Sequence, residues 1–269
     1  MTETRIKRKY VRKNTIIDPS VSEPSMYTIN ERFEFVSQMV MMLASGDQAS
    51  VVLTGPGGLG KSHTVMQSLI KSGYDDLSQM DIELENYPDL KVFKKVSGFS
   101  TPKGLYQELY ENRHANCVLV FDDIDNILQN DVSVNLLKAA LDSYSTRIIS
   151  WKSRIVDDLP KSFEFEGKVV FISNMSSARI DQAILSRSLT VDLSMTNMEK
   201  VDRMKYLLSQ DDFMPEYEPQ FKNEALALIE SVMDKVRDLS LRTLIQVTKI
   251  RASNPDGNWK NLSQYVMCG

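Results

Sequence analysis

The strongest constraint on this chain is one octapeptide, Gly55-Pro56-Gly57-Gly58-Leu59-Gly60-Lys61-Ser62. It fits the pattern G-x-x-x-x-G-K-[ST], it follows the short apolar run Val51–Thr54, and it precedes a segment with helical periodicity. Glycines let the main chain wrap around phosphate oxygens, and the positive end of the following helix adds to the attraction. The octapeptide therefore predicts a nucleotide-binding loop, in which Lys61 reaches the β- and γ-phosphates and Ser62 is a ligand of Mg²⁺. We include the next residue, His63, in the predicted binding segment.

Two carboxylates follow about 60 residues later, directly after the apolar run Cys117–Phe121. In an open parallel sheet, ligands collect at the carboxyl ends of the strands. We therefore predict that Asp122 holds Mg²⁺ and that Asp123 orients and deprotonates an attacking water molecule. The alternative is a plain acidic turn, in which Asp125 helps to cap the next helix.

The pattern of apolar residues divides the chain into three parts. Residues 1–26 show no regular periodicity and read as a basic, flexible arm. Residues 27–196 alternate strand and helix patterns, which predicts a parallel sheet with helices on both faces. Residues 197–269 carry helical patterns only and predict a small all-α lid domain. We expect the first helix of the middle part to be capped by Asn30 and to end near Gly46.

Three further segments extend the pattern of motifs. The apolar run Val169–Ser173 ends beside Asn174, Ser186-Arg187 follows a short helical segment, and Arg242 lies at the start of a helix near the C-terminus. With these, the chain resembles the AAA+ ATPases from about Tyr27 to Met267. In that family such segments are sensor 1, the arginine finger and sensor 2.

The resemblance implies an α/β fold of the P-loop NTPase type with a helical lid, and an enzyme that binds and hydrolyses ATP with Mg²⁺. It implies that Asn174 helps to place the attacking water and that Arg242 acts from the lid. Arg187 would reach the nucleotide of the next subunit, so a homo-oligomer, a ring or a spiral, is implied.

Asp123 stands where most members have Glu. An Asp-Asp pair occurs in the initiator branch, and Ser186-Arg187 is similar to the Ser-Arg-Cys of clamp-loader subunits. The chain thus looks like the clamp-loader or initiator branch, in the style of compact phage or plasmid members.

The macromolecule on which such an ATPase would act is less constrained. The basic segment Arg5–Lys13 is either a nucleic-acid-binding tail or a solvated terminus. The segment Arg147–Arg154 reads either as part of a hairpin that contacts nucleic acid or as a connection with Trp151 packed on the sheet. Phe99, after Gly98, is either an exposed grip on a substrate or a packed aromatic at a helix entry.

We interpret the chain first as a nucleic-acid-associated ATPase, a helicase loader, clamp loader or replication or packaging factor. The alternatives are a protein-remodelling ATPase with a protein partner and an ATP-dependent switch with little turnover. No apolar run approaches the ~20 residues that span a bilayer, so no membrane association is expected. Two unrelated cysteines, Cys117 and Cys268, suggest a cytoplasmic protein without disulfides or zinc.

Overall fold

The computed structural model describes residues 25–80, 82, 84, 87, 89–151, 159–254 and 257–269. The predicted arm therefore lies almost wholly outside the described residues, as does its basic segment Arg5–Lys13. None of the described helices is long and apolar enough to cross a membrane.

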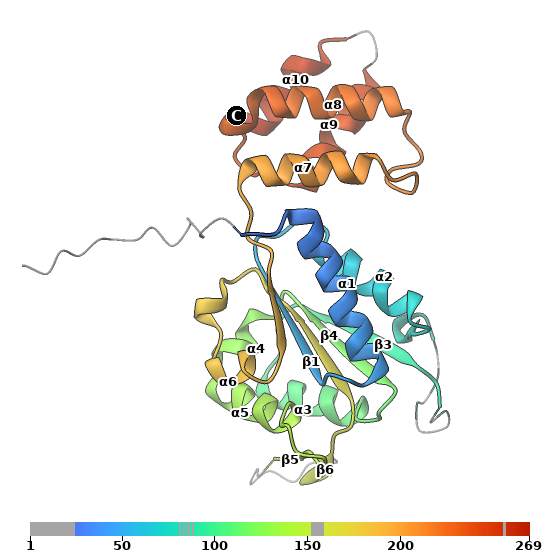
Figure 1. The fold of residues 1–269 in the computed structure, drawn as a ribbon, viewed down its shortest axis with the longest axis vertical. Helices are drawn as coiled ribbons and strands as arrows, with labels where there is room; N and C mark the ends of the chain where they lie inside the picture. The colour runs from blue at the N-terminus through green and yellow to red at the C-terminus, as the bar shows by residue number, and fades with distance from the viewer. Residues whose placement is uncertain are drawn as a thin grey trace, which may run out of the picture.

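Six strands form one parallel sheet at the centre of the larger part of the molecule (Figure 1). The parallel fold class predicted from the sequence is confirmed. The edge strand β2 was not predicted, because two residues are too short for any periodic pattern. In spatial order the strands are β2 (Asp75–Asp76), β3 (Val92–Ser97), β4 (Cys117–Asp122), β7 (Lys168–Ile172), β1 (Ser50–Thr54) and β8 (Leu189–Asp192).

Helices cover both faces of the sheet because the central strands are apolar on both sides. Within β4, Val118 and Val120 pack into the cluster under one pair of helices, whereas Leu119 and Phe121 pack into the cluster on the opposite face. The first face carries α1 (Ile29–Ser45) and α2 (Lys61–Lys71), and the second carries α3 (Pro102–Glu111), α4 (Asp125–Gln129), α5 (Asp131–Ala140) and α6 (Gln182–Leu185).

Helix α1 begins two residues earlier than the cap predicted at Asn30. Its N-cap is Thr28, whose hydroxyl accepts from the main-chain N–H of Glu31, while the Glu31 carboxylate accepts from the main-chain N–H of Thr28. This reciprocal capping box satisfies two donors at the helix end. Because Thr28 is the N-cap, the prediction of Asn30 was wrong. The predicted end at Gly46 agrees, since Gly46 is the C-cap in a left-handed conformation.

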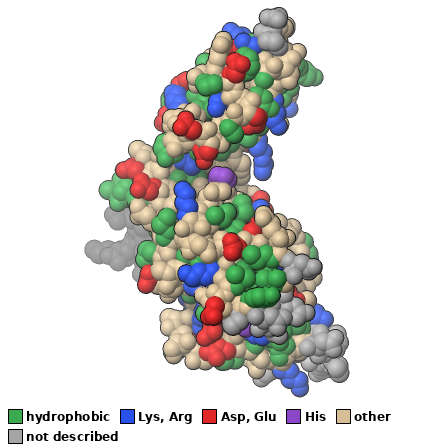
Figure 2. Space-filling model, turned by 90° about the vertical axis from the view of Figure 1, so that its right-hand side faces the viewer, with side chains coloured by type: hydrophobic (Ala, Val, Ile, Leu, Met, Phe, Trp, Pro, Cys, Tyr) green, Lys and Arg blue, Asp and Glu red, His purple; other side chains and the backbone are tan. Residues whose placement is uncertain are grey.

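Four helices follow the sheet and pack on one another around their own apolar cluster, above the carboxyl edge of the strands (Figure 1). The molecule narrows between this lid and the sheet domain (Figure 2). Arg32 of α1 connects the sheet domain to the lid. Its guanidinium donates to the main-chain oxygen of Ser194, in the connecting segment, and forms an ion pair with Glu199 in the first lid helix. The lid helices are α7 (Asn197–Leu208), α8 (Pro219–Val232), α9 (Leu241–Ser253) and α10 (Trp259–Cys268).

The hairpin predicted before sensor 1 is present, as β5 (Ile148–Ser150) pairs antiparallel with β6 (Ser162–Glu164). Two side chains that the sequence singled out here, Trp151 and Arg147, are engaged in packing. The Trp151 ring lies 5.8 Å from the Tyr106 ring, and the Arg147 guanidinium donates to the main-chain oxygens of Ala140 and Gly167. These contacts favour the packed interpretation of Trp151 and leave Arg147 turned inward. Residues 152–158, with the rest of the basic segment, lie outside the described residues.

Candidate nucleotide-binding site

The glycine-rich loop joins β1 to α2 at the edge of the sheet that faces the lid. Gly55 has a φ of +121°, and a Cβ there would lie 2.7 Å from the main-chain carbon of Leu193. Gly58 has a φ of +73°, and a Cβ there would lie 3.1 Å from Cβ of Ser240 in the lid. The loop can therefore take this shape only with glycine at these positions, which explains the motif in steric terms.

The ammonium group of Lys61 lies inside this loop and is surrounded by oxygen atoms. Its Nζ donates to the main-chain oxygens of Gly55 and Pro56, at 2.5 and 2.8 Å, and to Oδ1 of Asn174 at 3.0 Å. Burial lowers the pKa of Lys61 to about 8, against the opposing pull of Asp123 and other nearby carboxylates. A buried cation of this kind is suited to bind an anion with oxygen atoms.

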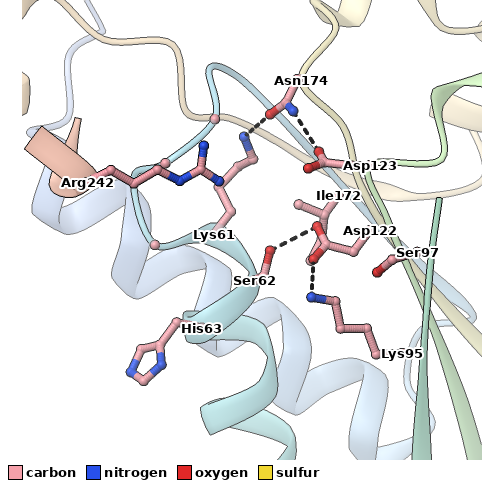
Figure 3. Close-up of a pocket in the computed structure, with 13 residues that line it drawn as sticks. Lys61, Ser62, His63, Lys95, Ser97, Asp122, Asp123, Ile172, Asn174 and Arg242 are labelled. Atoms are coloured by element: carbon pink, nitrogen blue, oxygen red, sulfur yellow. Dashed lines mark hydrogen bonds and ion pairs between the residues drawn. The ribbon is translucent and has the colours of Figure 1, made fainter. Parts of the chain in front are cut away.

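Ser62 and Asp122 meet below the loop. The Ser62 hydroxyl donates to Oδ1 of Asp122 at 2.9 Å, and Lys95 of β3 reaches Oδ2 of the same carboxylate at 2.7 Å (Figure 3). Asp122 is buried, with 6% of its surface exposed. A hydroxyl and a carboxylate are the hard oxygen ligands that Mg²⁺ prefers.

Asp123 and Asn174 lie on the other side of Lys61. Nδ2 of Asn174 donates to Oδ1 of Asp123 at 2.7 Å, so one amide bridges the lysine and the carboxylate. Burial, followed by the nearby charge of Asp122, raises the pKa of Asp123, although Lys61 pulls it down. The backbone of Asp123 has a φ of +59° and is held by a hydrogen bond from its N–H to the oxygen of Ile172.

The lid touches the loop directly. The main-chain N–H of Leu241, the first residue of α9, donates to the oxygen of Gly58 at 2.9 Å. Arg242 follows, and its side chain lines the same cavity as the loop (Figure 3). The position of the lid is therefore mechanically linked to the conformation of the glycine-rich loop.

These side chains enclose one cavity of about 410 Å³. Lys95 and Ser97 of β3 also line it, although the sequence analysis missed them, because no motif marks a strand residue whose place depends on sheet register. Among the predicted residues, Gly55 and Pro56 contribute their carbonyl groups to Lys61, and Leu59 turns its side chain into the core. The predicted residues that line the cavity are Gly57, Gly58, Gly60, Lys61, Ser62, His63, Asp122, Asp123, Asn174 and Arg242.

Two residues that the sequence analysis singled out, Arg187 and Phe99, do not line this cavity. Arg187, just beyond α6, donates from its guanidinium to the main-chain oxygen of Ala183. Phe99 follows Gly98 beyond the end of β3, and 80% of its surface is exposed. The interpretation of Phe99 as a packed aromatic was therefore wrong.

The glycine-rich loop, the Asp pair, Asn174 and Arg242 thus converge on one cavity, between a parallel sheet and a helical lid. The chain has the predicted fold of the P-loop NTPase type, a parallel sheet with helices on both faces followed by a helical lid. Strand β7, which ends two residues before Asn174, lies between β1, which leads into the glycine-rich loop, and β4, which ends at Asp122. This order brings the three motifs together.

Comparisons with known proteins give a relative by sequence and several similar solved structures. No protein-family model matches the chain. An uncharacterized 36.7 kDa protein of Enterobacteria phage T4 is 29% identical over 252 residues, which cover 87% of this chain and 73% of that protein.

Similar solved structures include ORC1 of Aeropyrum pernix in complex with DNA, with 13% identity, a TM-score of 0.49, and coverage of 93% of this chain and 68% of that one. Domain III of the replication initiation protein DnaA of Thermotoga maritima has 13% identity and a TM-score of 0.47, with coverage of 90% and 97%. The FIGL-1 AAA domain in complex with ADP has 15% identity and a TM-score of 0.43, with coverage of 82% and 69%.

The lowered pKa of Lys61 predicts how the binding of a phosphate group at this site would depend on pH. Only the protonated ammonium attracts phosphate, and the protein without nucleotide begins to lose that proton near pH 8. The affinity for ADP in EDTA should therefore be constant below pH 8 and fall by about tenfold per pH unit above it. The phosphates of ADP lose their last proton near pH 6, so they add no change in this range.

Equilibrium titrations of ADP between pH 7 and 9.5 measure this dependence. The control is Lys61→Arg, whose guanidinium stays charged, so its weaker affinity should not vary over the same range. A wild-type affinity that is constant up to pH 9.5 would contradict the direct contact between Lys61 and phosphate.

Proposed function

We propose that this chain binds ATP together with Mg²⁺ and hydrolyses it. The observation that carries the proposal is the convergence of Lys61, Asp122 and Asp123 on one cavity at the glycine-rich loop. A loop that merely turned the chain would need neither a buried ammonium group nor two carboxylates beside it, because each buried charge costs free energy.

The residues present fit the phosphates of ATP. Lys61 now donates to carbonyl oxygens of its own loop and to Asn174, and phosphate oxygens can take the place of those acceptors. The N-terminus of α2, a helix of 11 residues without a side-chain cap, lines the same cavity, and such a helix end attracts anions. His63 borders both this cavity and a second one of about 420 Å³ between α1, α2 and α7, where there is room for the nucleoside part.

Mg²⁺ fits the pair formed by Ser62 and Asp122. Among the described residues, no group of three or more His, Cys, Asp or Glu side chains could hold a metal alone. A metal here would therefore share its oxygen ligands among Ser62, Asp122, water and the nucleotide, as is usual for Mg²⁺. When bound, the ion neutralises charge on the phosphate oxygens.

Asp123 is placed to act as the general base. Partial desolvation, followed by the nearby charge of Asp122, raises the pKa of its carboxyl group, which makes the carboxylate a better proton acceptor than an isolated Asp in water. Asn174 holds that carboxylate with one end of its amide and contacts Lys61 with the other. Arg242 adds positive charge from the lid, so that the lid can respond to the nucleotide that it covers.

Replacement of Asp123 by Asn separates hydrolysis from binding. Asp123→Asn keeps the size of the side chain and an acceptor for Asn174, but the amide cannot take a proton. Phosphate release should fall by about 10²-fold or more, while ATP affinity is retained. Asp131→Asn, an exposed carboxylate at the start of α5, is the matched control and should keep wild-type turnover. Wild-type turnover in Asp123→Asn would refute the role of the base.

We further propose that the active form is a homo-oligomer, a ring or a spiral, in which Arg187 completes the site of the neighbouring subunit. Support comes from its place outside the cavity of its own chain and from its partial exposure. The competing interpretation pairs Arg187 with Asp181 or Asp192 on the surface of a monomer. Asp181, however, contacts Lys138 at 3.2 Å and accepts from the main-chain N–H of Ala183, and Asp192 accepts from the main-chain N–H of Ser194. An arginine at the phosphates of a neighbour adds on the order of 10³–10⁵ in rate.

Mixed oligomers test this arrangement. Arg187→Ala and Lys61→Ala subunits should each be inactive alone, yet a mixture should recover part of the ATPase activity, because some junctions pair an intact loop with an intact arginine. Turnover per wild-type subunit should also rise with protein concentration. Absence of rescue together with turnover that does not depend on concentration would exclude an arginine supplied by the neighbour.

For the macromolecule, we propose nucleic acid, as in a helicase loader, clamp loader or replication or packaging factor. The basic segment Arg5–Lys13 supports this, whereas Arg147 and Trp151 are engaged in packing, and on the face shown in Figure 2 positive and negative side chains are interspersed. The exposed Phe99 favours a second candidate, a protein-remodelling ATPase. Stimulation of turnover by DNA would support the first candidate. Stimulation by an unfolded polypeptide, lost in Phe99→Ala, would support the second. Tight ATP binding with almost no turnover would instead indicate a switch.

A further inference from the structure

Lys95 occupies a place that no motif of the chain assigns. It lies on β3, and its Nζ is 2.7 Å from Oδ2 of Asp122, while Ser62 holds Oδ1 of the same carboxylate at 2.9 Å. Its side chain points into the cavity from the wall opposite α2 (Figure 3). The ammonium group therefore sits against the carboxylate that the proposed function assigns to Mg²⁺.

The burial of the two partners differs. Only 9% of the Asp122 side chain is exposed, against 36% of the Lys95 side chain. A carboxylate buried to this extent is costly without a cation, so Lys95 stabilises Asp122 when no metal is bound. The lysine, on a flexible four-carbon stem and partly in solvent, is the partner that can leave.

We propose that Lys95 is an internal counter-ion of Asp122 and that Mg²⁺ displaces it when the metal and nucleotide bind. The inference rests on the proposed function, since it needs Ser62 and Asp122 to hold the metal. Two positive charges of Mg²⁺ and the charge of the ammonium compete for one carboxylate in a partly buried site, where like charges repel strongly. Lys95 thus opposes metal binding and protects the empty site.

The structure offers a destination for the displaced group. Lys95 also lines a third cavity, of about 630 Å³, which adjoins the nucleotide-binding cavity. Glu111 and Tyr110 of α3 border this third cavity. Lys94 and Glu111, which lie 3.7 Å apart, border the same cavity from the other face of β3. A turn of the Lys95 side chain about its stem would take the ammonium from Asp122 towards this cavity without a change in the strand.

Removal of the charge tests the exchange in two ways. Lys95→Met keeps the stem, so nucleotide binding in the presence of Mg²⁺ should reach half-saturation at about tenfold lower Mg²⁺ concentration than in the wild type. In EDTA without nucleotide, the same variant should melt at a lower temperature, because Asp122 has lost its cation. Saturating Mg²⁺ and ADP should abolish that difference in melting temperature.

Lys94→Met is the matched control. Lys94 is the adjacent residue on β3, has a similarly exposed side chain and pairs with Glu108, on the other face of the strand. Its variant should keep the wild-type dependence on Mg²⁺. Lys95→Arg retains the charge and should also keep the wild-type dependence on Mg²⁺. A change seen only in Lys95→Met is then due to loss of the charge, not to a folding defect caused by any substitution at this position.

Three results would overturn the exchange or the function beneath it. If the wild type binds nucleotide and Lys95→Met needs the same or a higher Mg²⁺ concentration for half-saturation, displacement of Lys95 is excluded. Loss of ADP affinity in EDTA in that variant would make Lys95 a phosphate ligand instead. A wild type and a Lys94→Met variant that bind no nucleotide at all would refute the proposed function itself.

Discussion

The parallel pairing of β4, β7 and β1 is the constraint on which the site depends. Ile172 of β7 lies level with Leu53 of β1 on one side and with Asp122 of β4 on the other. Adjacent strands are about 4.8 Å apart, so the P-loop and the Asp pair begin about 10 Å from each other, with Asn174 between them. A shift of either pair by one residue would turn the side chains to the other face and separate the groups.

Within that frame, Lys61, Asp122 and Asp123 each have polar partners in the site. Lys61 is held by loop carbonyls and Asn174, Asp122 by Ser62 and Lys95, and Asp123 by Asn174. Each of these partners can be exchanged for an oxygen atom of a nucleotide, for a metal ion or for water. The lid is part of the same system, because α9 donates a main-chain hydrogen bond to the loop. Nucleotide binding is therefore expected to change contacts in the loop, on β3 and in the lid together.

The sequence predicted those parts of the site that local chemistry determines. The glycine-rich loop is readable because its shape requires glycine, and Asp122 and Asn174 are readable because each follows an apolar run that can only be a buried strand. Lys95 was not predictable, since its role depends on the register of β3 against β4. The exposure of Phe99 and the packing of Trp151 on Tyr106 depend likewise on tertiary contacts between distant segments. The division at residues 196 and 197 and the roles of individual site residues remain predictions.

The central claim is that the loop around Lys61 binds ATP. Isothermal titration calorimetry of ATP with Mg²⁺ into the nucleotide-free protein, alongside Lys61→Ala, measures this most directly. The wild type should bind one ATP per chain, and the variant should bind at least about 10²-fold more weakly, because a charge-assisted contact in a shielded site is lost. Equal affinity in the two proteins, or no binding by the wild type, would contradict the claim.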